Sequence, residues 1–523
     1  MPHFPIVTAI AFAALVVALT ALARRLPIPT PILQVVAGLL VGLAPGVAIP
    51  ELEPDLVFFV FLPPVLWAAA LFTSLREFKA NLQPISWLAI GLVLATSAAV
   101  AVAARALLPG LSWPIAIALG AIVSPPDAVA AAAIVSRLPV PRRVIVILEG
   151  ESLVNDASAL VLYRTAIVAA VTGVFSWGES IVRFFIDAGV GALVGLLVGW
   201  IIIRAARWTK DSLAEVLLTI AGPYVAWVAA ESLHVSAVLA CVAGGLYLRQ
   251  HLSTAVSPMS RLQTKSTWDL LVFLLNAMIF ILLGAQFGQL LQSVPAGRMG
   301  SLLGAGAAIG AVVIVVRLIW VPISTWCPRQ LQRDARRRAP ADNWKPVVLI
   351  AWTSMRGIVS LASALALPLV LANGSPFPYR TELIVITMCV IVLTLLVQGL
   401  TLEPIIRALA FAPEHRHIEE EQLARREALR SGAEALEDVS REPWVEKGDV
   451  ARLREEVRDR ITSHEHHGGG SAGRRALRMH MITAERRMLV RLRNEGAISD
   501  EVLRELEQEL DLEAVRLGSG DAR

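Results

Sequence analysis

The chain is a succession of apolar stretches, each about 20 residues long or longer. A transmembrane helix needs roughly 20 mostly apolar residues, so stretches of this length predict membrane spans. Hydrophobic residues make up 56% of the 523 residues. The alternating short segments of outer-membrane barrels are not seen. These features exclude a soluble globular core and predict an all-α polytopic membrane protein.

We predict about thirteen spans, separated by loops that alternate in charge. Every second loop is rich in Lys and Arg, which is typical of loops on the cytoplasmic side. The alternation places the N-terminus outside and the C-terminus in the cytoplasm, in a cell membrane that we take to be a bacterial inner membrane. The predicted spans are 4–23, 28–49, 55–74, 84–107, 114–136, 144–174, 180–204, 212–231, 233–249, 268–293, 300–323, 345–372 and 381–411.

The two ends of the chain need separate interpretations. Residues 412–523 are rich in Glu and Arg, and we predict a cytosolic helical tail after a membrane domain of residues 1–411. Glycines at 468–470 predict a flexible linker within that tail. Its three histidines between 464 and 467 could bind a metal, but exposure to solvent is the favoured interpretation. At the other end, a signal peptide is disfavoured because the basic pair at 24–25 follows the first apolar run.

The sixth predicted span carries polar side chains near its middle. On a helix, Glu151, Asn155 and Ser158 fall on one strip, and Ser152 and Asp156 fall on the strip beside it. A carboxylate at membrane depth costs on the order of 2.5–3.5 kcal/mol or more. A chain that keeps two of them at this depth is expected to use them.

The fifth predicted span contains Ser124, two prolines and Asp127. Prolines in mid-helix remove backbone donors and clash with the preceding turn, so the helix must break. Exposed carbonyls are tolerated at membrane depth only where they face protein or a wet cavity. One interpretation is a kink capped by Asp127. The favoured one is a cation site that uses the freed carbonyls near Ser124 and the Asp127 carboxylate.

The twelfth predicted span contains Arg356. A buried arginine stays charged and needs a partner, and the acids expected at similar depth are Glu151, Asp156 and Asp127. We predict that Glu151 and Arg356 form a structural ion pair. That pairing would leave Asp156 free to bind and release ions.

Three motifs in this chain together resemble the sodium/proton exchangers, in the branch of bacterial NhaP-type and eukaryotic NHE-type proteins. They are Gly-Glu-Ser-Leu-Val-Asn-Asp at 150–156, Ser-Pro-Pro-Asp-Ala-Val at 124–129 and Met-Arg-Gly at 355–357. Their order and separation match over residues 5–410. The break differs from the family's usual Thr-Asp-Pro type, because here the prolines precede the acid.

The resemblance implies an NhaA/NhaP-like antiporter fold of about thirteen helices, with inverted repeats, broken helices, a dimerisation region and a mobile core, working as a homodimer. It implies that Asp156 is the acid that carries the ion, with Asp127 beside it as a monovalent-cation ligand. Members that move net charge have two aspartates where this chain has Asn155 and Asp156, which implies one cation exchanged for one proton. The residues that would bind or support the ion are Asp156, Asp127, Ser152, Glu151, Asn155 and Ser124.

Reasoning from the residues leads to the same mechanism. A single buried carboxylate holds a proton or a small cation, but not both well. Alternating access of such a site to the two sides of a membrane makes an antiporter. We expect Na⁺ as the cation, with Li⁺ or K⁺ as alternatives because oxygen ligands suit all three, and we expect no cofactor.

Other functions fit the sequence less well. A cation channel could line its pore with the same polar wedge, but the acids differ from one another and form no symmetric ring. An intramembrane metalloprotease would need a His-Glu-x-x-His pattern, which the spans lack. The basic residues follow the loops and form no patch, which speaks against a nucleic-acid partner.

Overall fold

The computed structural model describes residues 4–411 except 24, 27, 46–53, 136–137, 174–176, 210, 332–343 and 373, together with short pieces between 430 and 513. The chain divides into two compact units, Met1–Ala412 and Pro413–Arg523. Described pieces of the second unit, such as 430–438 and 450–455, are helical. The predicted linker at 468–470 and the histidines between 464 and 467 lie outside the described residues.

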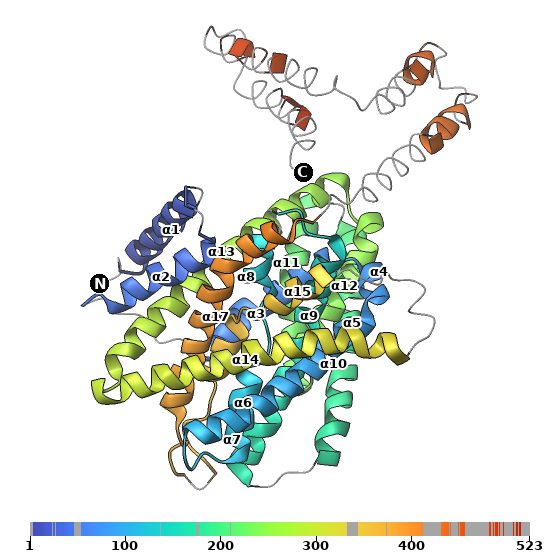
Figure 1. The fold of residues 1–523 in the computed structure, drawn as a ribbon. Helices are drawn as coiled ribbons and strands as arrows, with labels where there is room; N and C mark the ends of the chain where they lie inside the picture. Colours follow the sequence, from blue (N-terminus) through green and yellow to red (C-terminus); the bar gives the residue numbers. More distant parts are fainter. Residues whose placement is uncertain are drawn as a thin grey trace. The chain divides into compact units, whose positions relative to one another are not determined.

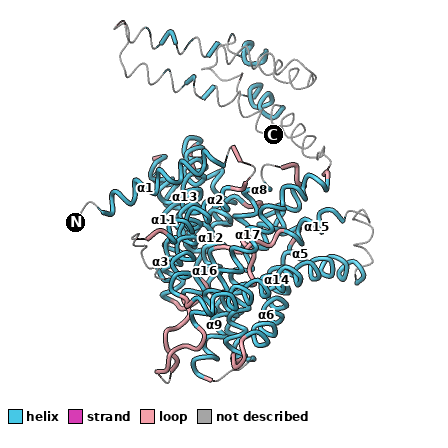
Figure 2. Tube along the Cα trace, turned by 60° about the vertical axis from the view of Figure 1, so that its left-hand side comes forward, coloured by secondary structure: helices cyan, strands magenta, loops and turns pink. Residues whose placement is uncertain are grey.

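The first unit is built from helices joined by loops (Figures 1 and 2), as the apolar stretches predict. The thirteen predicted spans all fall on helices, and two of them are divided. The elements are α1 (Phe4–Ala23), α2 (Thr30–Leu43), α3 (Pro54–Phe72), α4 (Leu75–Ala80), α5 (Leu82–Ser86), the π-helix η1 (Trp87–Leu92), α6 (Val93–Leu107), α7 (Trp113–Val123), α8 (Ala128–Val135), α9 (Arg142–Thr172), α10 (Trp177–Thr209), α11 (Ser212–Ser232), α12 (Ala237–Ala255), α13 (Pro258–Ser293), α14 (Ala296–Leu331), α15 (Trp344–Trp352), α16 (Ile358–Leu365) and α17 (Arg380–Leu409).

The surface of this unit is strongly apolar. Six described helical segments are long and apolar enough to cross a membrane, and four shorter apolar helices accompany them. Large apolar side chains are exposed along the helices, such as Leu193 (64% exposed) on α10 and Leu217 (65%) on α11. An exposed apolar surface of this kind is suited to lipid. The count of thirteen spans stays a prediction.

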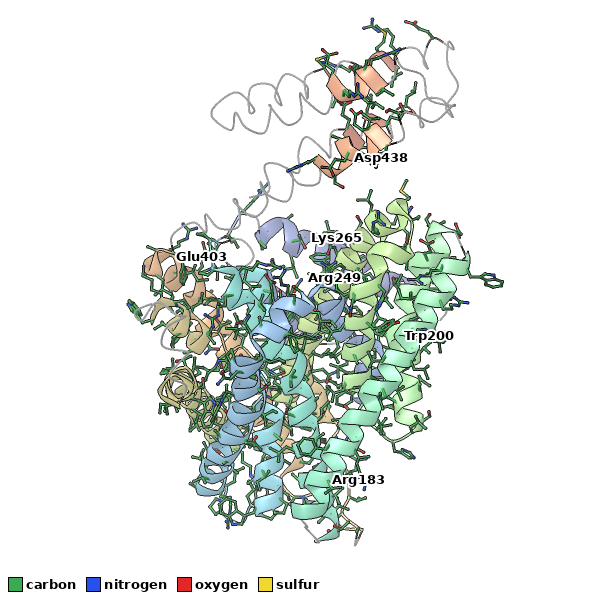
Figure 3. The ribbon with its side chains drawn as sticks, turned by 90° about the vertical axis from the view of Figure 1, so that its right-hand side faces the viewer. Arg183, Trp200, Arg249, Lys265, Glu403 and Asp438 are labelled. Carbon is green, nitrogen blue, oxygen red and sulfur yellow. The ribbon has the colours of Figure 1, made fainter. Side chains whose placement is uncertain are left out.

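One predicted cytoplasmic loop, between the predicted spans 233–249 and 268–293, lies at one end of the unit. Figure 3 places Arg249 and Lys265 near the same end, whereas Arg183, at the start of α10, lies near the opposite end. This is the separation expected if the helices cross the unit from end to end between alternating loops.

Several pairs of helices pack with their backbones in direct approach, and α10 with α12 is one of them. A Cβ atom added at Gly191 or Gly195 of α10 would overlap the carbonyl oxygen of Ser236 or Ala240, at the start of α12. At Gly199 the new atom would lie 3.1 Å from the carbonyl oxygen of Gly244. We call these three α10 glycines the glycine seam. Small residues at such spacing let helices approach closely inside a membrane.

Another close pair is α2 with α13, which lie side by side in Figure 1. A Cβ atom at Gly38 would overlap the carbonyl oxygen of Ile281, and one at Gly284 would overlap that of Val35. Glycines on both helices therefore allow this approach. The pair α2 and α13 thus packs by the same means as α10 and α12.

Two helices are interrupted near the middle of the unit. The predicted span 114–136 is divided into α7 and α8, with the break at Ser124 to Asp127 as the prolines predict. The predicted span 345–372 is also divided, into α15 and α16, with non-helical backbone from Thr353 to Gly357. The second break was not predicted, because no proline marks it.

Candidate ion-binding site

The two breaks touch one another at the centre of the unit. The backbone N–H of Asp127 donates a hydrogen bond to the carbonyl oxygen of Met355, at 2.6 Å. A Cβ atom added at Gly357 would overlap the Asp127 carboxylate. Position 357 therefore needs glycine for close approach, and that approach brings the start of α16 against the acid of the first break.

Arg356 joins the two breaks through carbonyl oxygens. Its side chain is buried, with 1% of the residue exposed. Its Nε donates to the carbonyl of Val123 at 2.9 Å, and its Nη2 donates to that of Ser124 at 3.3 Å. Its Nη1 donates to the carbonyl and the hydroxyl of Ser354. A cation beside the last carbonyls of a helix is favourable, so Arg356 satisfies backbone groups that the break at α7 exposes.

The ion pair at the centre has a different basic partner from the one predicted. Glu151 accepts hydrogen bonds from Arg317, from Nη1 to Oε1 and from Nη2 to Oε2, the latter at 2.8 Å. Both side chains are almost completely buried. The prediction of a Glu151–Arg356 pair is therefore wrong, because the carbonyls of the breaks already take up the Arg356 guanidinium and Arg317 reaches Glu151 in bidentate geometry.

Arg317 also bonds to backbone. Its Nε donates to the carbonyl of Ile350 in α15, at 3.1 Å. Arg317 lies on α14 and Glu151 on α9, so this one side chain links three helices. Sequence reasoning missed Arg317, although a signal was present: it is a single arginine between the apolar runs 311–316 and 318–321 of one predicted span.

Asn155 ties α9 to the first break. Its Nδ2 donates to the carbonyl oxygen of Pro126 at 3.2 Å, and the residue is completely buried. An aspartate at this position would have no N–H to donate. The amide therefore holds the broken backbone in place beside Asp156, the next residue on α9.

Asp156 lies on the wall of a cavity of about 520 Å³. Asp127 and Ser152 line the same cavity. The cavity also reaches Asp269 on α13, whose side chain is 60% exposed. Asp156 itself is only 6% exposed, so the cavity leads from solvent-exposed groups to a buried acid.

The structure thus separates the predicted site residues into two groups. Asp127, Ser152 and Asp156 line the cavity. The carbonyl of Ser124, expected to be freed for a cation, accepts from Arg356 instead. The remaining predicted residues, Glu151, Asn155 and Arg356, hold the helices around the cavity and are not part of its lining.

This arrangement offers oxygen atoms to a ligand. Asp127, Asp156 and Ser152 line one cavity together with two further acids, Glu149 and Asp269. Hard oxygen donors such as the Asp127 and Asp156 carboxylates suit small hard cations. A carboxylate in the same place also accepts a proton. Broken helices crossing at the middle of a helical membrane protein, beside a buried acid, define the class of secondary ion transporters.

Comparison with known proteins agrees with this class. The family model "Sodium/hydrogen exchanger, transmembrane" matches residues 11–408. An uncharacterized Na(+)/H(+) exchanger of Mycobacterium tuberculosis is 34% identical, and the alignment covers 98% of this chain and 96% of the exchanger's length. A sodium, potassium, lithium and rubidium/H(+) antiporter of Bacillus pumilus is 31% identical, and that alignment covers 92% of this chain and 73% of the antiporter's length. The chain belongs to the sodium/hydrogen exchanger family.

A solved structure shares the fold. The sodium proton antiporter MjNhaP1 from Methanocaldococcus jannaschii aligns with a TM-score of 0.61 and 21% identity, covering 78% of this chain and 99% of that one. The predicted NhaP-like antiporter fold is therefore confirmed, and the chain is a multi-pass membrane protein of the cation/proton antiporters.

Proposed function

We propose that the protein exchanges one monovalent cation for one proton by alternating access, with Asp156 as the group that binds both in turn. The observation that carries the proposal is the position of Asp156, a buried acid on the wall of a cavity that also reaches exposed groups. A proton and a cation compete for one carboxylate, so emptying the site of one ion allows the other to bind. Asp127 and Ser152, which line the same cavity, complete the proposed site.

The proposed stoichiometry is supported by Asn155. This side chain is a hydrogen-bond donor to the Pro126 carbonyl, a structural task that an ionised acid cannot perform. Two acids of α9, Glu149 and Asp156, line the cavity, and of these Asp156 is the buried one. With Asp156 as the carrier, one acid carries one charge in each direction. Exchange of one cation for one proton moves no net charge.

We propose Na⁺ as the main cation and K⁺ as the second candidate. The names of two relatives support this order: one is an Na(+)/H(+) exchanger and another is a sodium, potassium, lithium and rubidium/H(+) antiporter. We further propose a homodimer in a bacterial inner membrane, with the N-terminus outside and the C-terminus in the cytoplasm. In that topology, the exposed mouth of the cavity at Asp269 faces the cytoplasm, because neighbouring Lys265 belongs to a predicted cytoplasmic loop.

The test uses purified protein in liposomes that contain a pH-sensitive dye. Adding Na⁺, Li⁺ or K⁺ outside acid-loaded liposomes should raise the internal pH, with Na⁺ acting at the lowest concentration. An imposed membrane potential should leave the rate unchanged if the exchange is one for one. Cation flux that proceeds without any proton movement would indicate a channel and refute the proposal.

A further inference from the structure

We infer that Ser360 supplies an additional oxygen ligand to the transported cation, so that the second broken helix helps to select which cation is carried. This rests on the proposed function. Ser360 lies on α16, outside the three motifs that point to the family and outside the predicted site.

The Ser360 hydroxyl is buried and unsatisfied. The residue is 1% exposed, and its Oγ has no hydrogen-bond partner among the residues that the structure describes. A buried polar group without a partner costs free energy and calls for an explanation. A ligand that the group binds during the working cycle is such an explanation.

The residue lies at a place where a ligand fits. Ser360 lines the same cavity as Asp127, Ser152 and Asp156. Its position on α16 fits this placement, since residues three apart on a helix share a face and Gly357, three residues earlier, packs against the Asp127 carboxylate. The first turn of α16 therefore places Ser360 on the helix face that packs against the acid.

A neutral oxygen changes selectivity more than overall attraction. The two carboxylates supply the negative charge, and selectivity among monovalent cations depends on the number and field strength of the oxygens that replace water. Removing one hydroxyl should therefore weaken cation binding unequally for Na⁺, Li⁺ and K⁺. The protonation of Asp156 should change less, because a proton needs no coordination shell.

The experiment compares Ser360→Ala with Ser363→Ala in the liposome assay. Ser363 lies on the same helix and is 2% exposed, but it does not line the cavity, so it controls for loss of a buried hydroxyl from α16. We expect Ser360→Ala to raise the KM for the preferred cation by about three- to tenfold, the scale of one neutral hydrogen bond. The rank order or spacing of the three cations should change, with kcat within about twofold of wild type.

The second variant, Ser360→Thr, keeps a hydroxyl and should retain a KM nearer to that of wild type than Ser360→Ala does. Two results would overturn the inference and leave the proposed function standing, provided that the wild-type protein is active. In one, Ser360→Ala leaves the KM values unchanged; in the other, Ser363→Ala changes them as much as Ser360→Ala does. A wild-type protein without coupled exchange would instead refute the proposed function itself.

Discussion

Two buried regions of this protein are held together in opposite ways. The first is the glycine seam, where α10 and α12 approach with bare backbone against backbone. The second, which we call the polar centre, is held by ion pairs and hydrogen bonds to broken backbone. Its members are Asp127, Glu151, Asn155, Asp156, Arg317 and Arg356.

The difference shows where a membrane protein can place chemistry. Unbroken helices satisfy their own backbone groups, so the seam needs only small side chains and close contact. A broken helix exposes carbonyls and N–H groups, and other side chains must satisfy them. Arg356 and Asn155 do so, which leaves the Asp156 carboxylate facing a cavity. The seam should therefore control stability alone, whereas the polar centre should control both stability and ion binding.

The largest expected effect is on the buried ion pair. Arg317→Met leaves the Glu151 carboxylate buried without its partner, and breaking such a pair costs about 3–5 kcal/mol. We expect little folded protein, measured as the monodisperse fraction and melting temperature in detergent. The double variant Glu151→Gln with Arg317→Met removes both charges and should recover much of the loss. A single variant as stable as wild type would show that the pair does not stabilise the centre.

The next effect is on the glycine seam. Gly195→Leu forces a side chain against the carbonyl of Ala240, and overpacking of a filled interface costs typically about 1–3 kcal/mol. We expect a lower melting temperature, while the folded fraction transports with an unchanged KM for cation. A raised KM in this variant would mean that the seam also shapes the ion site, against the comparison drawn above.

A smaller loss of stability, but a change in binding, is expected at the breaks. Gly357→Ala would make its Cβ atom overlap Oδ2 of Asp127, so the carboxylate must move away to relieve the overlap. We expect the KM for cation to rise several-fold. Gly304→Ala on α14 is the control, since a Cβ atom there meets no neighbour within 4 Å. Equal KM values for the two variants would contradict the assigned role of Asp127.

The smallest effect is expected at Ser158. It shares a helical strip with Glu151 and Asn155, but its hydroxyl donates to the carbonyl of Val154 on its own helix, at 3.2 Å. Ser158→Ala should shift the melting temperature by no more than about 2 °C, because a hydrogen bond within the helix contributes little net stability. The KM for cation should stay unchanged. A several-fold loss of transport would extend the site beyond the cavity.

Much of the fold could be predicted because membrane burial imposes simple rules. Length and hydropathy locate the helices, and two adjacent prolines force the break at Ser124 to Asp127. The second break has no such mark. Its backbone leaves the helix where Gly357 must approach Asp127, and that contact lies between segments about 230 residues apart in the chain.

The choice of ion-pair partner could not be predicted for a related reason. Buried arginines must be paired, but sequence gives neither the depth nor the direction of each guanidinium. Arg356 lies among carbonyls of both breaks, and these satisfy it without an acid. Arg317 instead donates directly to the Glu151 carboxylate. Pairing rules identify the groups that need partners, and helix packing decides which partner each one meets.

The most direct test of the central claim is transport by Asp156→Asn. The amide cannot release a proton, so the substituted site cannot exchange a proton for a cation. In liposomes with an internal pH dye, this variant should insert and fold but give no cation-dependent pH change. The control Glu403→Gln, at a partly exposed acid paired with Arg407, should exchange as wild type does. Cation-dependent proton movement that persists in Asp156→Asn would contradict the account.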